Sequence, residues 1–131
     1  MQPRLTVVYS DLTVSLIDAV NAKGDTPREV LKNLFTEFNS GSERESVVFR
    51  SIHCRSMSVG DFARVDGQWY RRDECGWKPV DDAFVARWMA EIRRRVGIDM
   101  KNDPRQAHWI AANNMMFELE SSGCQPYWTL R

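Results

Sequence analysis

The sequence has few cysteines and no long hydrophobic run. Its 131 residues include three cysteines, with no CxxC pair. An odd, widely spaced set is more typical of free thiols in a reducing cytosol than of a disulfide framework. No run approaches the roughly 18 apolar residues of a membrane span, and the first residues lack the basic and apolar regions of a signal peptide. We therefore expect a soluble cytoplasmic protein with no membrane partner.

The sequence also lacks an excess of charge of either sign. Eighteen basic residues balance eighteen acidic ones, so no global field attracts nucleic acid, and such a role would need a local basic patch. The motifs GxGxxG, GxxxxGK[ST], HExxH and GxSxG do not occur. The sequence accordingly suggests neither a cofactor nor a familiar catalytic site.

The overall composition is that of a folded protein. Apolar residues make up 43% of the chain and charged residues 27%, with five Trp, three Tyr and six Phe, which argues against disorder. A chain of this length can bury one core. We expect a single domain over residues 1–131.

The middle of the chain predicts a small β unit. Two short apolar runs, 62–65 and 69–70, flank the pair Asp66-Gly67. An Asp-Gly pair in this position predicts a two-residue type I′ hairpin, because both central residues need a positive φ. A third short strand is expected over 76–79.

Two other stretches predict strands, and one is ambiguous. β-branched and aromatic residues favour strands over 4–9 and 47–52. The stretch 12–20 fits both strand alternation and helical spacing, and we interpret it as a short helix.

Three further helices have recognisable start signals. Each begins with a side chain that can cap the first turn, and two of them continue with proline at the first helical position. The predicted helices run from the capping box at Thr26 to about residue 39, from Asp81 or Asp82 to a cap at Gly97, and from Asp103 to about residue 120. The fold class is therefore α+β: a small antiparallel sheet with a central Asp-Gly hairpin, packed by a helix from the N-terminal half and by two C-terminal helices.

The candidate catalytic and metal-binding residues form no convincing group. A thiolate activated by a neighbouring imidazole is conceivable at His53-Cys54, but adjacent residues on a strand point to opposite faces. A zinc site from His53, Cys54, Cys75 and Cys124 has enough ligands but no close pairs. His108 is interpreted as a satisfied structural histidine. No catalytic residue, metal or cofactor is assigned.

Binding residues are easier to propose. An exposed Trp beside paired arginines makes a good interface anchor, and arginines at a helix end can bind an acidic surface or phosphate. The candidate partner-binding residues are Trp69, Arg71, Arg72, Arg93, Arg94 and Arg95. The predicted helix from Asp103 to about residue 120 is apolar around much of its circumference, which suggests a homodimer interface or a partner site.

The order of motifs over residues 4–80 resembles the YodL-like domain family. The resemblance rests on a helix ending in Phe38-Asn39, on the hairpin and Tyr70 that follow, on Gly76-Trp77, and above all on the string Arg55-Ser56-Met57-Ser58-Val59-Gly60-Asp61. The chain has Asp73-Glu74-Cys75 where that family usually has Asp-Ser-Phe, and the two C-terminal helices (81–121) lie outside the match.

This resemblance implies a context rather than a mechanism. Such domains occur in phages, plasmids and integrative elements, and no catalytic residue set is attached to them. The leading hypothesis is a non-enzymatic mobile-element protein that inhibits a host defence system, of anti-CRISPR or antirestriction type, by binding a host protein or nucleoprotein complex in the bacterial cytoplasm. The alternatives are a nucleic-acid-binding accessory protein and an enzyme that uses Cys54 or Cys75.

Overall fold

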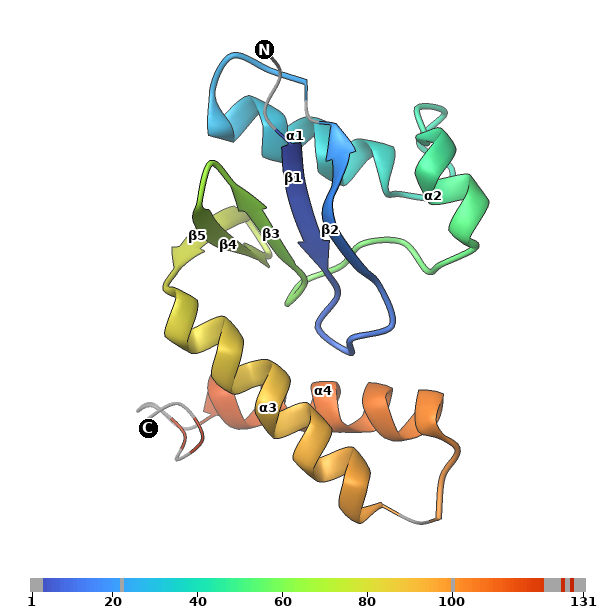
Figure 1. The fold of residues 1–131 in the computed structure, drawn as a ribbon, viewed down its shortest axis with the longest axis vertical. Coiled ribbons are helices and arrows are strands. Elements are labelled where there is room, and N and C mark those ends of the chain that lie inside the picture. Colours follow the sequence, from blue (N-terminus) through green and yellow to red (C-terminus); the bar gives the residue numbers. More distant parts are fainter. Residues whose placement is uncertain (1–3, 22, 100, 122–125, 127, 129–131) are drawn as a thin grey trace.

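A computed structural model describes residues 4–21, 23–99, 101–121, 126 and 128 of the chain. It contains an antiparallel sheet with the strand order β2-β1-β3-β4-β5 and four helices (Figure 1). In chain order the elements are β1 (Arg4–Val8), β2 (Ser15–Asn21), α1 (Pro27–Glu37), α2 (Val47–Ile52), β3 (Phe62–Val65), β4 (Gln68–Asp73), β5 (Gly76–Val80), α3 (Asp82–Ile98) and α4 (Pro104–Ser121). The predicted α+β fold class is confirmed.

The central hairpin forms as predicted. Asp66 and Gly67 have φ values of 49° and 83°, which is the backbone conformation that a type I′ turn needs. The turn sets the register in which Val65 pairs with Gln68 and Phe62 with Arg71.

The helix starts also form at the predicted caps. The Thr26 side chain accepts a hydrogen bond from Glu29 N at 3.2 Å, and Asp81 accepts one from Phe84 N at 2.8 Å. At the start of α4, Asp103 accepts from Gln106 N at 3.1 Å. Side-chain acceptors at these positions satisfy N–H groups that have no partner within the helix.

The helix predicted over 12–20 is wrong, because this stretch turns and then forms β2. Leu12 has a φ of 60°, and Tyr9 N donates to Val14 O at 2.9 Å, which closes a tight turn after β1. From Ser15 onward the backbone pairs antiparallel with β1. The stretch forms a strand because it pairs with β1, and the local sequence does not show this pairing.

The strand predicted over 47–52 is also wrong, because these residues form α2. The Ser46 side chain accepts from Phe49 N at 3.1 Å, so a cap outweighs the β propensity of the two valines. The Val47 side chain is 80% exposed and gains nothing from a half-buried strand.

The predicted C-terminal cap at Gly97 is wrong as well. Gly97 lies inside α3, which ends at Ile98 with Asp99 as the cap residue.

Side chains from the two faces of the sheet enter different clusters of buried residues. Alternate residues of a strand point to opposite faces, so Leu5 and Val7 pack with α1, whereas Val8 and Phe62 pack with α3 and α4. The first cluster contains Leu5, Val7, Tyr9, Val14, Val30, Leu31, Leu34, Phe38, Phe49, Met57, Ala63 and Val65. The second contains Val8, Phe62, Val85, Trp88, Ile92, Ala111, Ala112, Met115 and Trp128. Figure 1 shows α1 on one side of the sheet and the α3–α4 pair on the other.

The C-terminal helices are tied directly to the N-terminal half. Trp88 of α3 is fully buried, and its indole N–H donates to Ser10 O at 2.7 Å, just beyond β1. The aromatic residues near the C-terminus, Tyr127 and Trp128, are expected from the sequence to pack back on the core. Trp128 belongs to the same buried cluster as Trp88, and Tyr127 lies outside the described residues.

Candidate functional site

The paired arginines of β4 do not form one patch. Successive side chains of a strand alternate, so Trp69 and Arg71 lie on the α3 side of the sheet, whereas Tyr70 and Arg72 lie on the α1 side. Trp69 packs edge-on against Phe62, with ring centroids 6.5 Å apart.

Arg71 is mostly enclosed. Its Nε and Nη2 atoms are buried without a hydrogen-bond partner in the described part of the chain. Burial lowers the pKa of Arg71, although the carboxylates of Asp73 and Glu120 act in the opposite direction. Among the predicted binding residues of β4, Arg72 is thus the one that faces an open cavity.

Of the three α3 arginines, Arg95 connects α3 to α4, whereas Arg94 pairs with a residue of α3 itself. Arg95 donates to Glu118 of α4 through both terminal nitrogens, at 2.6 and 2.8 Å, and to Glu91 at 3.0 Å. Arg94 also pairs with Glu91. The hydrogen bond from Arg95 lowers the pKa of the Glu118 carboxyl. Arg93 and Arg94 are exposed, so Arg95 is the member of the predicted three-arginine patch that connects the two helices.

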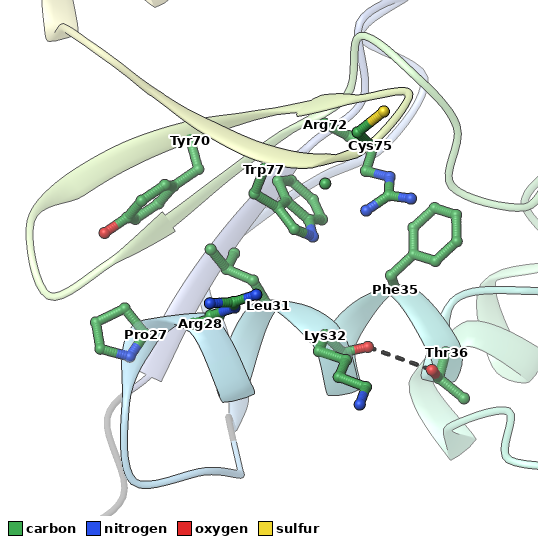
Figure 2. A pocket seen from close by; sticks show the side chains of 11 residues that line it. Pro27, Arg28, Leu31, Lys32, Phe35, Thr36, Tyr70, Arg72, Cys75 and Trp77 are labelled. Carbon is green, nitrogen blue, oxygen red and sulfur yellow. Dashed lines mark hydrogen bonds between the residues drawn. The ribbon is translucent and has the colours of Figure 1, made fainter.

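The most developed cavity lies between α1 and the β4–β5 hairpin. It has a volume of about 730 Å³, within the roughly 300–1,000 Å³ of typical ligand pockets. Its walls are formed by Pro27, Arg28, Leu31, Lys32, Phe35, Thr36, Tyr70, Arg72, Cys75, Gly76 and Trp77 (Figure 2). We call this cavity the α1–β5 groove.

The α1–β5 groove combines positive charge with aromatic surface. Arg28 and Lys32 are one helical turn apart on α1, and none of the described residues that line the groove carries a carboxylate. Arg72 lies with its Cζ atom 4.0 Å from the ring centroid of Phe35 and 6.0 Å from that of Trp77. These distances place Arg72 in cation–π contact with both rings.

Sequence reasoning missed the α1 side of this groove. Neither Arg28 nor Lys32 is among the binding residues predicted from the sequence. Their spacing of four residues places both cations on one helix flank, beside the half-buried ring of Phe35. That pattern was a usable signal, but its pairing with β4 and β5 depends on how α1 lies on the sheet.

A second cavity contains the predicted His53-Cys54 pair. Its volume is about 470 Å³, and both residues line it, together with Arg55 and Arg105. The expectation that the two side chains diverge assumed a strand, whereas His53 follows α2 with a φ of 51°. Cys54 Sγ lies 3.6 Å from the Tyr9 hydroxyl.

The possible zinc ligands His53, Cys54, Cys75 and Cys124, to which no metal is assigned, are only partly described by the structure. Cys54 and Cys75 are free thiols, and Cys124 lies outside the described residues. Within the part of the chain that the structure describes, no three His, Cys, Asp or Glu side chains are grouped so as to hold a metal ion. His108 is half-buried on α4, and its Nδ1 donates to Pro104 O.

The segment 55–61, which carries the resemblance to YodL-like domains, has a structural role. Asp61 is fully buried and accepts hydrogen bonds from Ser10 N and Ser58 N, each at 2.8 Å. Arg55 donates to both of its carboxylate oxygens. Burial by itself lowers the pKa of Arg55, but the hydrogen bonds and charge of Asp61 outweigh burial and raise it.

Comparison with models of known protein families, with characterised proteins and with solved structures found no match. The resemblance to the YodL-like family therefore stays a prediction. None of the helices in the described ranges is both long and apolar enough to cross a membrane.

Proposed function

We propose that this protein is a non-enzymatic phage or mobile-element protein that inhibits a host defence system by binding a host protein complex. The target belongs to the class of CRISPR effectors or restriction enzymes, and the site of action is the bacterial cytoplasm. The observation that carries the proposal is the α1–β5 groove, which joins three cations to half-buried aromatic rings. Arginine and aromatic side chains in desolvated pockets are the usual energetic centres of protein interfaces.

A second candidate is binding of nucleic acid. The same three cations, Arg28, Lys32 and Arg72, could neutralise phosphates. Affinity for nucleic acid would then fall steeply with salt concentration, whereas a protein interface with a desolvated centre depends on salt much less.

Two matched charge-reversal variants test the proposal. Arg28→Glu/Lys32→Glu reverses the α1 flank of the groove. Arg44→Glu/Arg50→Glu makes the same change in charge at exposed positions just before and within α2, outside the groove. Each protein is expressed in a bacterial strain with a defined CRISPR or restriction system and challenged with a phage that the system targets.

We expect the wild type and the Arg44/Arg50 variant to restore plaque formation and the Arg28/Lys32 variant not to. A pull-down at high salt after nuclease treatment should recover the defence complex with the two active proteins. If a pull-down without nuclease recovers nucleic acid but no defence complex, and nuclease treatment removes that nucleic acid, the proposal is overturned in favour of the second candidate.

A further inference from the structure

The groove contains a hydrogen-bond donor with no acceptor. Trp77 Nε1 is buried and has no partner in the described part of the chain. A buried donor without an acceptor costs about 1–3 kcal/mol, so native proteins rarely leave such a donor without a hydrogen bond. Figure 2 shows this indole nitrogen facing the space between β5 and α1, above Leu31.

The surroundings of this donor favour an acceptor with a negative charge. Arg72 lies against the indole, with Cζ 6.0 Å from its ring centroid, and Arg28 and Lys32 line the same groove. A hydrogen bond to an ionised acceptor is stronger than one to a neutral group. The arrangement therefore fits a carboxylate or phosphate oxygen held between Trp77 and Arg72.

The aromatic rings are poorly placed to stack nucleobases. Single-stranded nucleic acid is usually held on open ring faces, but Arg72 covers the Phe35 ring at 4.0 Å. A protein segment that brings both acidic and apolar side chains suits the groove better.

The spacing of the α1 cations agrees with an extended chain. Residues four apart on a helix have Cβ atoms roughly 5–6 Å apart. Alternate residues of an extended strand, on one face, are roughly 6.5–7 Å apart. Two acidic residues at positions i and i+2 of a peptide can therefore meet Arg28 and Lys32 separately.

We propose that the α1–β5 groove binds an extended acidic segment of a partner protein. One carboxylate accepts from Trp77 Nε1 and Arg72, and further carboxylates pair with Arg28 and Lys32. An apolar side chain of the segment covers the exposed parts of Phe35 and Tyr70. The inference rests on the proposed function and names the kind of surface that the host complex must present.

Fluorescence anisotropy tests this with a fluorescein-labelled peptide of alternating glutamate and leucine. We expect saturable binding to the wild type. The affinity of Trp77→Phe for the peptide should be lower by at least about tenfold, because an aromatic ring remains but a hydrogen bond to a charged group is lost. Arg28→Glu/Lys32→Glu should abolish binding, and Arg44→Glu/Arg50→Glu should leave it unchanged. In heteronuclear NMR spectra the Trp77 Nε1–H resonance should shift on addition of the peptide.

The outcome for folding separates a binding role from a structural one. Trp77→Phe removes an unpartnered donor, which is stabilising, and part of an apolar contact with the first buried cluster, which is destabilising. The variant should therefore stay folded, with a modest change in unfolding free energy. Equal affinity of Trp77→Phe and wild type, or equal binding of a lysine–leucine peptide, would overturn the proposal. Preference for fluorescein-labelled single-stranded oligo-dT over the acidic peptide would overturn it in favour of nucleic acid.

Failure of this inference and failure of the proposed function give different results. If the Arg28/Lys32 variant still captures the defence complex and blocks it, the groove inference falls and the function stands. If the acidic peptide binds as expected but the wild type never protects the phage, the groove inference stands and the function falls.

Discussion

Arg55 and Asp61, six positions apart in the sequence, form a two-bonded ion pair, with Nη1 to Oδ2 at 2.8 Å and Nη2 to Oδ1 at 2.9 Å. The carboxylate is fully buried, whereas the Arg55 side chain is 32% exposed. The guanidinium also lies over the Tyr9 ring, with Cζ 4.2 Å from its centroid. The pair fixes the end of β1 to the start of β3, so the Arg55–Asp61 string is explained by folding.

Replacing Asp61 by Asn should therefore destabilise the protein strongly. The change leaves Arg55 with the longer 3.3 Å contact to Asp11 in place of a two-bonded pair and weakens two backbone hydrogen bonds, and breaking a buried pair in this way costs about 3 kcal/mol. Urea denaturation at neutral pH measures the effect. Asp73→Asn, which removes a surface pair with Lys78, should leave the unfolding midpoint nearly unchanged. Equal effects of the two substitutions would contradict this account of the loop.

The elements predicted correctly from sequence are those that local chemistry decides. Asp66-Gly67 needs positive φ at both residues whatever surrounds it. Thr26 and Asp81 satisfy backbone N–H groups within their own first turn. Each of these signals lies within a few residues of the structure that it determines.

The wrong predictions concern segments whose secondary structure depends on a distant pairing partner or on a competing helix cap. Residues 15–20 become a strand because β1 offers a pairing edge, and 47–52 become a helix because Ser46 caps it. The α1–β5 groove could not be predicted for the first of these reasons. Arg72 was predicted as a binding residue, but its neighbours Phe35 and Trp77 come from α1 and β5, and no local pattern places these elements together.

Gly60 should tolerate alanine less well than Gly67 does. Both have positive φ, 98° and 83°, so each substitution incurs backbone strain of about 1–2 kcal/mol. A Cβ at Gly60 would also lie 2.5 Å from Met116 Sδ, whereas a Cβ at Gly67 meets nothing within 4 Å. Chemical denaturation should show a larger loss for Gly60→Ala. In a Met116→Ala background the two losses should converge, and an unchanged difference would rule out the clash with Met116 as its cause.

Tyr9 should make the protein less stable at alkaline pH. Burial, followed by its hydrogen bond and charge interaction with Cys54, raises the pKa of the Tyr9 hydroxyl well above its usual value. Below the unfolded pKa of about 10 both states keep the proton, and above it the unfolded state loses a proton that the folded state retains. The stability contributed by the protonated hydroxyl is therefore lost as pH rises through that range.

Unfolding free energies between about pH 8 and about pH 11 test this shift. The alkaline decline should be shallower in Tyr9→Phe than in the wild type, although Tyr9→Phe is less stable at neutral pH because the hydroxyl no longer donates to Arg55 O at 2.9 Å. Tyr70→Phe is the control and should keep the wild-type slope. Parallel curves for Tyr9→Phe and wild type would contradict the raised pKa.

Cys75 should react with thiol reagents faster than Cys54. Cys75 is exposed at the rim of the α1–β5 groove, whereas Cys54 is half-buried against the Tyr9 hydroxyl. Mass spectrometry after brief treatment with iodoacetamide at neutral pH measures the order, with Cys75→Ser as the control for assignment. Faster modification of Cys54 would revive the enzyme hypothesis, because it would indicate an activated thiolate in the second cavity.

The outer face of α4 should mediate self-association. Its core-facing side chains are small or flexible (Ala107, Ala111, Ala112 and Met115), while Trp109 and Phe117 are 57% and 71% exposed. Two large exposed rings on one helix are a common sign of an interface. We expect light scattering after size-exclusion chromatography to show a concentration-dependent dimer that Trp109→Gln/Phe117→Gln converts to a monomer. Ile17→Gln, which changes an apolar residue of β2 that is also 71% exposed, should remain dimeric. A wild-type protein that stays monomeric at all concentrations would exclude the homodimer.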